Sequence, residues 1–131
     1  MSFSVDLSRW VAKAHGNVDK VVRQTLVLAS QGIMQRSPVD TGRFRANWQF
    51  AVNAPDVTTS WRVDPSGAIT MAQLQGQIAS IKAGPTFYLT NSLPYAYRLE
   101  NGWSSQAPAG MVSVTLAGLQ AAVNEYVSRL R

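Results

Sequence analysis

The chain has 131 residues, enough for one domain with a substantial buried core and too few for two such domains. Hydrophobic residues make up 46% and charged residues 15%, a globular composition that excludes a disordered tail. Cysteine is absent, which excludes a disulfide framework and thiolate metal sites and suits a reducing cytoplasm. The formal net charge of +5 is diffuse, with one local cluster at Arg36, Arg43 and Arg45.

The first predicted element is a helix over residues 6–36. Its second half carries apolar residues at steps of three and four, which stacks them on one face: Val18, Val22, Leu26, Ala29 and Ile33. Gly16 and Asn17 predict a break, with Asn17 as the cap of the second part. Pro38 ends the helix, because proline lacks the backbone donor and restricts the residue before it.

A turn and two strands are predicted next. In the turn, Asp40 can bond the backbone two residues ahead and Gly42 can adopt a positive φ. From Arg43 to Val52 the apolar period becomes two, which is typical of a half-buried strand. Its predicted polar face contains Arg45, Asn47 and Gln49. A second strand over 59–63 is expected to pair with it in the antiparallel sense.

The second half of the chain predicts a helix over 69–81, a short strand over 86–90 and a short helical or irregular piece over 95–100. A final helix is expected from Pro108 to the C-terminus, because Pro108 suits a first-turn position and apolar residues follow at helical spacing. Together these elements predict one α+β domain, 1–131, in which long N- and C-terminal helices and a middle helix pack on a small, mainly antiparallel sheet.

Residues for catalysis are scarce. His15 is the only histidine, and nothing around it resembles a nucleophile elbow or a zinc site. Asp40, Asp56, Asp64 and Glu100 could converge on a metal ion, as in a nuclease. The three aspartates instead stand in turn contexts beside proline or glycine, where structural roles suffice. The sequence therefore predicts no enzyme, no cofactor and no metal site.

Targeting signals are also absent from the sequence. Residues 1–6 contain no basic region leading into an apolar stretch, so no secretion signal is predicted. No run reaches about 18 apolar residues, so no membrane span is predicted. We therefore expect a protein that is made and assembled in the cytoplasm.

Two stretches carry a resemblance. The first signature segment is Ser37-Pro-Val-Asp-Thr-Gly-Arg-Phe-Arg-Ala-Asn-Trp48. The second runs over 91–112 and contains Asn91-Ser-Leu-Pro-Tyr-Ala-Tyr-Arg-Leu-Glu-Asn-Gly102 and Ala107-Pro-Ala-Gly-Met-Val112. In this order they resemble the tail-completion and minor-tail-component family of long-tailed bacteriophages. The residues that match its pattern are Pro38, Asp40, Thr41, Gly42, Arg43, Tyr95, Ala96, Glu100, Gly102, Pro108, Gly110 and Met111. No such signature is present in residues 53–84.

The resemblance implies a non-enzymatic virion protein assembled in the host bacterial cytoplasm. It implies a homo-oligomeric ring, six-fold in symmetry, at the head–tail neck. The ring would join head-closure and connector proteins to the tail terminator and tail tube. It would surround the passage through which DNA leaves the head, which leaves open a non-specific contact with DNA.

Several of these residues have more than one interpretation. Asp40 and its neighbours can simply end a helix, or the turn can also touch a neighbouring ring component. We expect Glu100 to pair with Arg43 or Arg45 and so tie the two signature segments together. The polar face of Arg45, Asn47 and Gln49 can be solvated, form a contact between subunits or face DNA.

Trp103, an aromatic residue in a polar loop, is a further candidate for an interface. Two other functions stay open from the sequence. The runner-up is a small DNA-binding module using Arg36, Arg43 and Arg45. A metal nuclease built on the carboxylates is the third.

Overall fold

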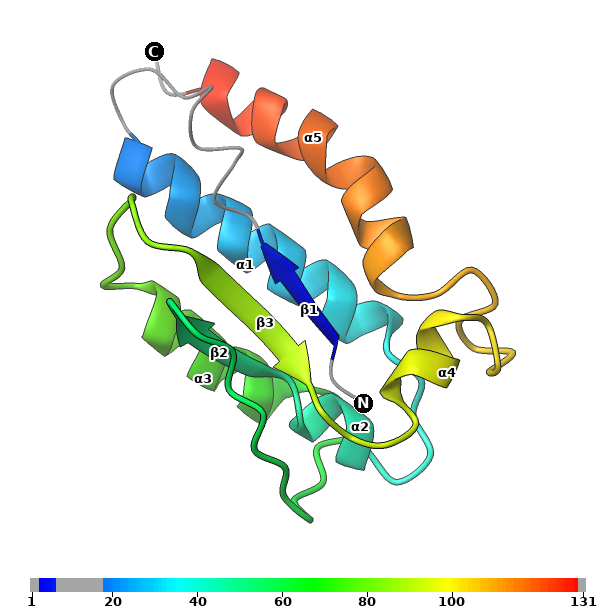
Figure 1. Ribbon diagram of the computed structural model, residues 1–131. Coiled ribbons are helices and arrows are strands. Elements are labelled where there is room, and N and C mark those ends of the chain that lie inside the picture. Colours follow the sequence, from blue (N-terminus) through cyan, green and yellow to red (C-terminus); the bar gives the residue numbers. More distant parts are fainter. Residues whose placement is uncertain (1–2, 7–17, 130–131) are drawn as a thin grey trace.

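The computed structural model describes residues 3–6 and 18–129 (Figure 1). Its elements in chain order are β1 (Phe3–Asp6), α1 (Val18–Arg36), α2 (Arg43–Ala46), β2 (Gln49–Val52), α3 (Ala68–Ile78), β3 (Phe87–Asn91), α4 (Ala96–Glu100) and α5 (Val112–Ser128). The predicted α+β class, with long helices near both ends of the chain and a middle helix, is confirmed. None of the described helices is long and apolar enough to cross a membrane.

The sheet has three strands in the order β1-β3-β2, and both pairs are antiparallel. The central strand, β3, therefore pairs on both sides, with Leu89 opposite Val5 on one edge and opposite Phe50 on the other. Both neighbours of β3 come from much earlier in the chain. The sheet consequently forms only after long-range closure.

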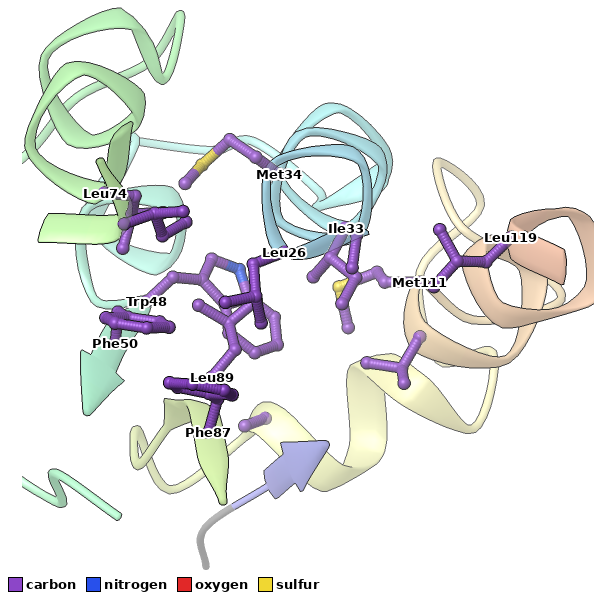
Figure 2. Packing of buried hydrophobic residues seen from close by; sticks show 14 of the residues in the cluster. Leu26, Ile33, Met34, Trp48, Phe50, Leu74, Phe87, Leu89, Met111 and Leu119 are labelled. Carbon is purple, nitrogen blue, oxygen red and sulfur yellow. The ribbon is translucent and has the colours of Figure 1, made fainter. Parts of the chain in front are cut away.

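The core lies between the sheet and α1, which runs behind the strands in Figure 1 with α5 on one side and α3 on the other. Figure 2 shows Leu26 of α1 beside Trp48, and Ile33 of α1 beside Met111. The ring of Phe50 stacks on that of Phe87, with centroids 6.1 Å apart. Burying each such large apolar side chain contributes about 1.5–3 kcal/mol.

The end of α1 is tied to the core through one hydroxyl. Ser37 is buried, and its Oγ donates to the Ile33 carbonyl at 2.8 Å. The same Oγ accepts a hydrogen bond from Trp48 Nε1 at 2.9 Å, which satisfies the polar atom of a buried indole. The serine before the helix-ending proline thus positions the start of the sheet.

Three predictions from the second half of the chain are confirmed with small shifts of boundary. The helix predicted over 69–81 is α3, the strand over 86–90 is β3, and the short piece over 95–100 is α4. In α3 the buried residues Thr70, Leu74 and Ile78 stand four apart, the spacing of one helical face. The spacing of the buried residues was therefore sufficient to predict this helix.

The strand predicted over 43–52 is wrong in its first part. Arg43–Ala46 forms the helical turn α2, and β2 begins only at Gln49. Phe44 and Trp48 are both buried, and their spacing of four suits a helical turn as well as it suits a strand. Gly42, at φ +94°, turns the chain into α2.

The strand predicted over 59–63 is also wrong. No regular strand forms there, and Trp61 and Val63 are exposed rather than buried on a sheet face. Its expected partner, residues 43–52, is helical in its first part and pairs with β3 through Gln49–Val52. Residues 53–67 form a long excursion between β2 and α3 instead.

Both ends of the chain required correction. Asp6, predicted to begin a helix, is the last residue of β1. The last helix begins at Val112 and not at Pro108, so Pro108 is not a first-turn residue. The prolonged helix through Trp10, the break at Gly16 and the cap at Asn17 lie outside the described residues, as do His15 and Arg131.

Candidate interaction site

The two signature segments meet at one surface pocket. Its volume is about 310 Å³, and its walls come from the turn 38–44 and from Tyr95, Leu99, Ser104 and Gln106. Phe44 contacts Tyr95 across this junction, with ring centroids 5.9 Å apart. Segments about fifty residues apart in sequence therefore build a single site.

Gln106 links the two segments directly. Its Oε1 accepts a hydrogen bond from the Val39 amide at 2.9 Å, and its Nε2 donates to the Val39 carbonyl at 2.9 Å. A primary amide satisfies both backbone groups of one residue in this way, much as a neighbouring strand would. Gln106 was not singled out from the sequence, because nothing local marks its distant partner.

Gly42 holds the floor of the turn in place. A Cβ at this position would lie 2.5 Å from the Pro65 nitrogen, and φ is +94°. The Gly42 carbonyl accepts from the amides of Ala46 and Asp64, and Thr41 Oγ1 accepts from the Arg43 amide. The positive φ predicted for Gly42 is confirmed, but the turn leads into the helix α2 and not into a strand.

Asp40 behaves differently from the prediction. Its carboxylate is exposed at the pocket rim, and it accepts no hydrogen bond from the backbone two residues ahead or from any other described residue. The turn is stabilised by Thr41 and Gly42 instead. Asp40 is thus a free negative charge beside the pocket.

Glu100 caps the final helix. Its Oε1 accepts from the amides of Met111 and Val112 at 2.8 and 2.9 Å, and its Oε2 accepts from Ser113 at 3.0 Å. The expected pairing of Glu100 with Arg43 or Arg45 is wrong: within residues 18–129 it forms no ion pair. The unsatisfied amides and positive dipole end of α5 provide a better partner for a half-buried carboxylate.

Two glycines allow this cap to close. Gly110 has φ +87°, and a Cβ there would lie 2.4 Å from the Glu100 carbonyl oxygen. Gly102 has φ +83°, and a Cβ there would lie 2.5 Å from the Pro108 carbonyl oxygen. The Pro-x-Gly-Met turn therefore packs backbone to backbone against the Glu-Asn-Gly turn. Side chains at either glycine would force them apart.

Arg45 links three backbone segments within the fold. Its guanidinium donates to the carbonyls of Ser37, Pro65 and Gln35 at 3.0, 2.9 and 3.1 Å. The prediction of a polar strand face at Arg45, Asn47 and Gln49 is therefore wrong, because this part of the chain turns as a helix and directs its side chains into neighbouring loops.

Asn47 is fully buried and holds the excursion 53–67 to the body. Its Nδ2 donates to the carbonyls of Arg43 and Ser60 at 2.7 and 3.1 Å, and its Oδ1 accepts from the Ser60 amide at 2.7 Å. Gln49 is half-buried beside a different groove. Asn47 was predicted at an interface but acts inside the fold.

Two arginine–tryptophan pairs stand near the pocket. The Arg43 guanidinium lies 3.7 Å from the ring centroid of Trp61, and that of Arg98 lies 5.1 Å from Trp103. Trp61 is 83% exposed and Trp103 73% exposed, so both indoles are open to a partner. Trp103 is exposed as an interface residue requires. Trp61 was misassigned to a sheet face, although a tryptophan between Pro55 and Pro65 in a polar stretch marks a loop.

The remaining carboxylates are engaged locally. Hydrogen bonds from the hydroxyl and amide of Thr58 lower the pKa of Asp56 below its usual value. Burial opposes ionisation of Asp64, but hydrogen bonds from Thr70 and the charge of Arg62 outweigh it, so the pKa of Asp64 is also lowered. Between 18 and 129, and in 3–6, no three histidine, aspartate or glutamate side chains are grouped to hold a metal ion.

The site thus consists of an outer pocket, two exposed tryptophans and a tightly determined backbone beneath them. Comparison of the chain with protein-family models, with curated proteins and with solved structures found no match.

Proposed function

We propose that the chain is a structural subunit of the neck of a long-tailed bacteriophage, a tail-completion protein that works as one copy in a ring. The observation that supports this most is the meeting of the two signature segments. They are far apart in the sequence, yet they line one pocket and are joined through Gln106 and the Phe44–Tyr95 contact.

The motif residues support the proposal because their pattern has a physical reason. Gly42, Gly102 and Gly110 each combine a positive φ with a backbone approach that excludes a side chain. Glu100 satisfies three amides at the start of α5. These residues therefore have a structural reason to occur together and in this order in this chain.

In the proposed ring, copies contact one another around the circumference and contact head-closure and connector proteins on one side. The tail terminator and tail tube lie on the other side, and DNA passes through the centre. Weak individual contacts suffice in such an assembly because many copies engage at once. Exposed tryptophan and arginine are the residue types that most often dominate such contacts.

The alternative, a DNA-binding module using Arg36, Arg43 and Arg45, has less support. Arg36 Nη1 donates to the Gly32 carbonyl and the Thr115 hydroxyl at 3.1 and 3.4 Å, and Arg43 Nε donates to the Ser60 carbonyl at 3.0 Å. Arg45 is bound to three carbonyls. These guanidinium groups are oriented by the fold rather than by a groove for phosphates.

Genetics and binding separate the two functions. A nonsense mutation early in the gene is expected to leave heads and tails that do not join, visible by electron microscopy of lysates, and complementation restores infectious particles. Filter binding of duplex DNA over a salt series should show weak binding. Joined particles without the protein, or tight DNA binding with a steep salt dependence, would contradict the proposal.

A further inference from the structure

Residues 47–81 form a segment that is almost free of charge. Residues 47–81 contain one arginine, Arg62, and two aspartates, Asp56 and Asp64, although the chain as a whole carries +5. Asp64 is buried and bound to the Thr70 amide, and Asp56 is bound to Thr58. Because this segment contributes −1, the rest of the chain carries +6.

The same segment holds most of the exposed apolar side chains. Of seven large hydrophobic residues exposed in the described part of the chain, five lie here: Val52, Val57, Trp61, Val63 and Ile69. Trp61 and Ile69 are 83% and 60% exposed. Loss of charge together with gain of aromatic and apolar surface distinguishes the centre of a protein–protein interface from ordinary surface.

Residues 52–63, which we call the arm, are exposed almost throughout. Figure 1 shows this stretch leaving the end of β2 and projecting from the body before it returns to α3. Asn47 and Arg43 hold it at Ser60. The amides of Val57, Trp61 and Val63 have no hydrogen-bond acceptor among the described residues, so backbone as well as side chains are available to a partner.

A matching groove lies between β2 and α3. Its volume is about 420 Å³, and the residues that line it are all uncharged: Trp48, Gln49, Gln73, Leu74, Gly76 and Gln77. The glutamine amides can both donate to and accept from an extended backbone. A Cβ on Gly76 would meet nothing within 4 Å, so the groove is open at that point.

We propose that the arm of one copy docks in the β2–α3 groove of the next copy, with Trp61 as its anchor. This inference rests on the proposed ring, and it names the surface through which copies meet. One arm and one groove on each copy form a head-to-tail contact, the kind that closes into a ring when the rotation between copies allows.

Charge argues for a second copy rather than another protein class. Two molecules that each carry +6 outside this segment repel one another wherever their basic surfaces meet. A contact between the arm, in which the charges of Asp56 and Arg62 cancel, and the uncharged groove avoids that repulsion. An acidic partner, in contrast, would need cations in the groove, and the residues that line it carry no charge.

Sedimentation velocity over a concentration series tests the anchor. The wild-type chain is expected to form oligomers, and Trp61→Ala is expected to weaken association at least about 30-fold. Trp103→Ala is the matched control, because it removes the other exposed tryptophan outside the segment, and it should leave association unchanged. A monomeric wild type, or equal losses for both variants, overturns the inference.

Cysteine cross-linking tests the pairing of arm and groove, since the native chain has no cysteine. Thr59→Cys in the arm mixed with Gln73→Cys in the groove should give an intermolecular disulfide, whereas Thr59→Cys mixed with Ala121→Cys on α5 should not. The inference is overturned if the first mixture gives no intermolecular disulfide, or if both mixtures give the same disulfide yield. If oligomers form without this cross-link, the proposed ring survives and only its surface is reassigned.

Discussion

The pocket of the signature segments and the segment 47–81 differ in how their residues are used. Around the signature pocket, side chains and glycines are fixed by internal contacts: Gln106 to Val39, Glu100 to the start of α5, Arg45 to three carbonyls. In the segment 47–81, which has few charges, the arm exposes nearly every side chain and is held chiefly at Ser60. The first region determines geometry, and the second offers surface. Mutations should therefore affect folding in one region and association in the other.

Gly42→Ala should produce the largest loss of stability in the signature region. The added Cβ would meet the Pro65 backbone at 2.5 Å at a φ of +94°, so we expect a loss of about 3 kcal/mol or more in the free energy of unfolding. Urea denaturation measures it. The matched control is Gly76→Ala in open helix surface, which should stabilise the chain by about 1 kcal/mol. Equal effects at the two glycines would contradict the comparison.

Asn47→Ala should weaken the link between the two regions. The Ser60 amide and the Arg43 carbonyl would lose a buried partner, so we expect a loss of about 2–3 kcal/mol in urea denaturation. The arm should also become more sensitive to limited proteolysis near residue 60. Gln49→Ala, at a half-buried position, is the control and should change little. A variant with unchanged cleavage would show that Asn47 does not hold the arm.

Glu100→Gln should lower stability by about 1–2 kcal/mol, because a neutral amide binds the amides and dipole of α5 less strongly than a carboxylate does. Asp40→Asn is the matched control, since Asp40 is the exposed acid of the other signature segment, and it should stay within about 0.5 kcal/mol of the wild type. Thermal unfolding followed by circular dichroism decides between them. A larger effect at Asp40 would reverse the roles assigned here.

The smallest expected effect is the contribution of Asp64 to the free energy of unfolding in acid. Although burial opposes ionisation, hydrogen bonds from Thr70 and the charge of Arg62 hold the pKa of Asp64 in the folded chain below that of an ordinary aspartate. Its stabilisation is therefore complete above the ordinary pKa and is lost as pH falls through the lower folded pKa. Asp64→Asn should therefore flatten the decline of unfolding free energy below about pH 4. Urea midpoints measured across the acid range test this, and an unchanged decline would contradict it.

The helices and β3 were predictable because their own residues determine them. Thr70, Leu74 and Ile78 occupy one face of α3 whatever packs on it. The structure of residues 43–48 was not predictable from the spacing of their apolar residues. Phe44 and Trp48 are both buried, and their spacing of four fits a helical turn and a strand equally. The strand expected over 59–63 failed because a strand exists only with a partner, and its expected partner, 43–52, is helical up to Ala46 and then pairs with β3.

The turns of the site were predictable from the sequence, but the hydrogen-bond partners of its side chains were not. The positive φ of Gly42 is a property of its own position, so local turn chemistry predicted it. Glu100 was assigned to an arginine because opposite charges attract, whereas the free amides of α5 appear only once the helix start is located at Val112. Asn47 and Gln106 bind groups 13 and 67 residues away, which no local pattern reveals.

Cryo-microscopy of the assembled particle tests the central claim most directly. We expect a ring of copies of this chain at the joint between head and tail, with DNA passing through its centre and each copy in the α+β fold. Complete particles in which the joint is built without this chain would contradict it.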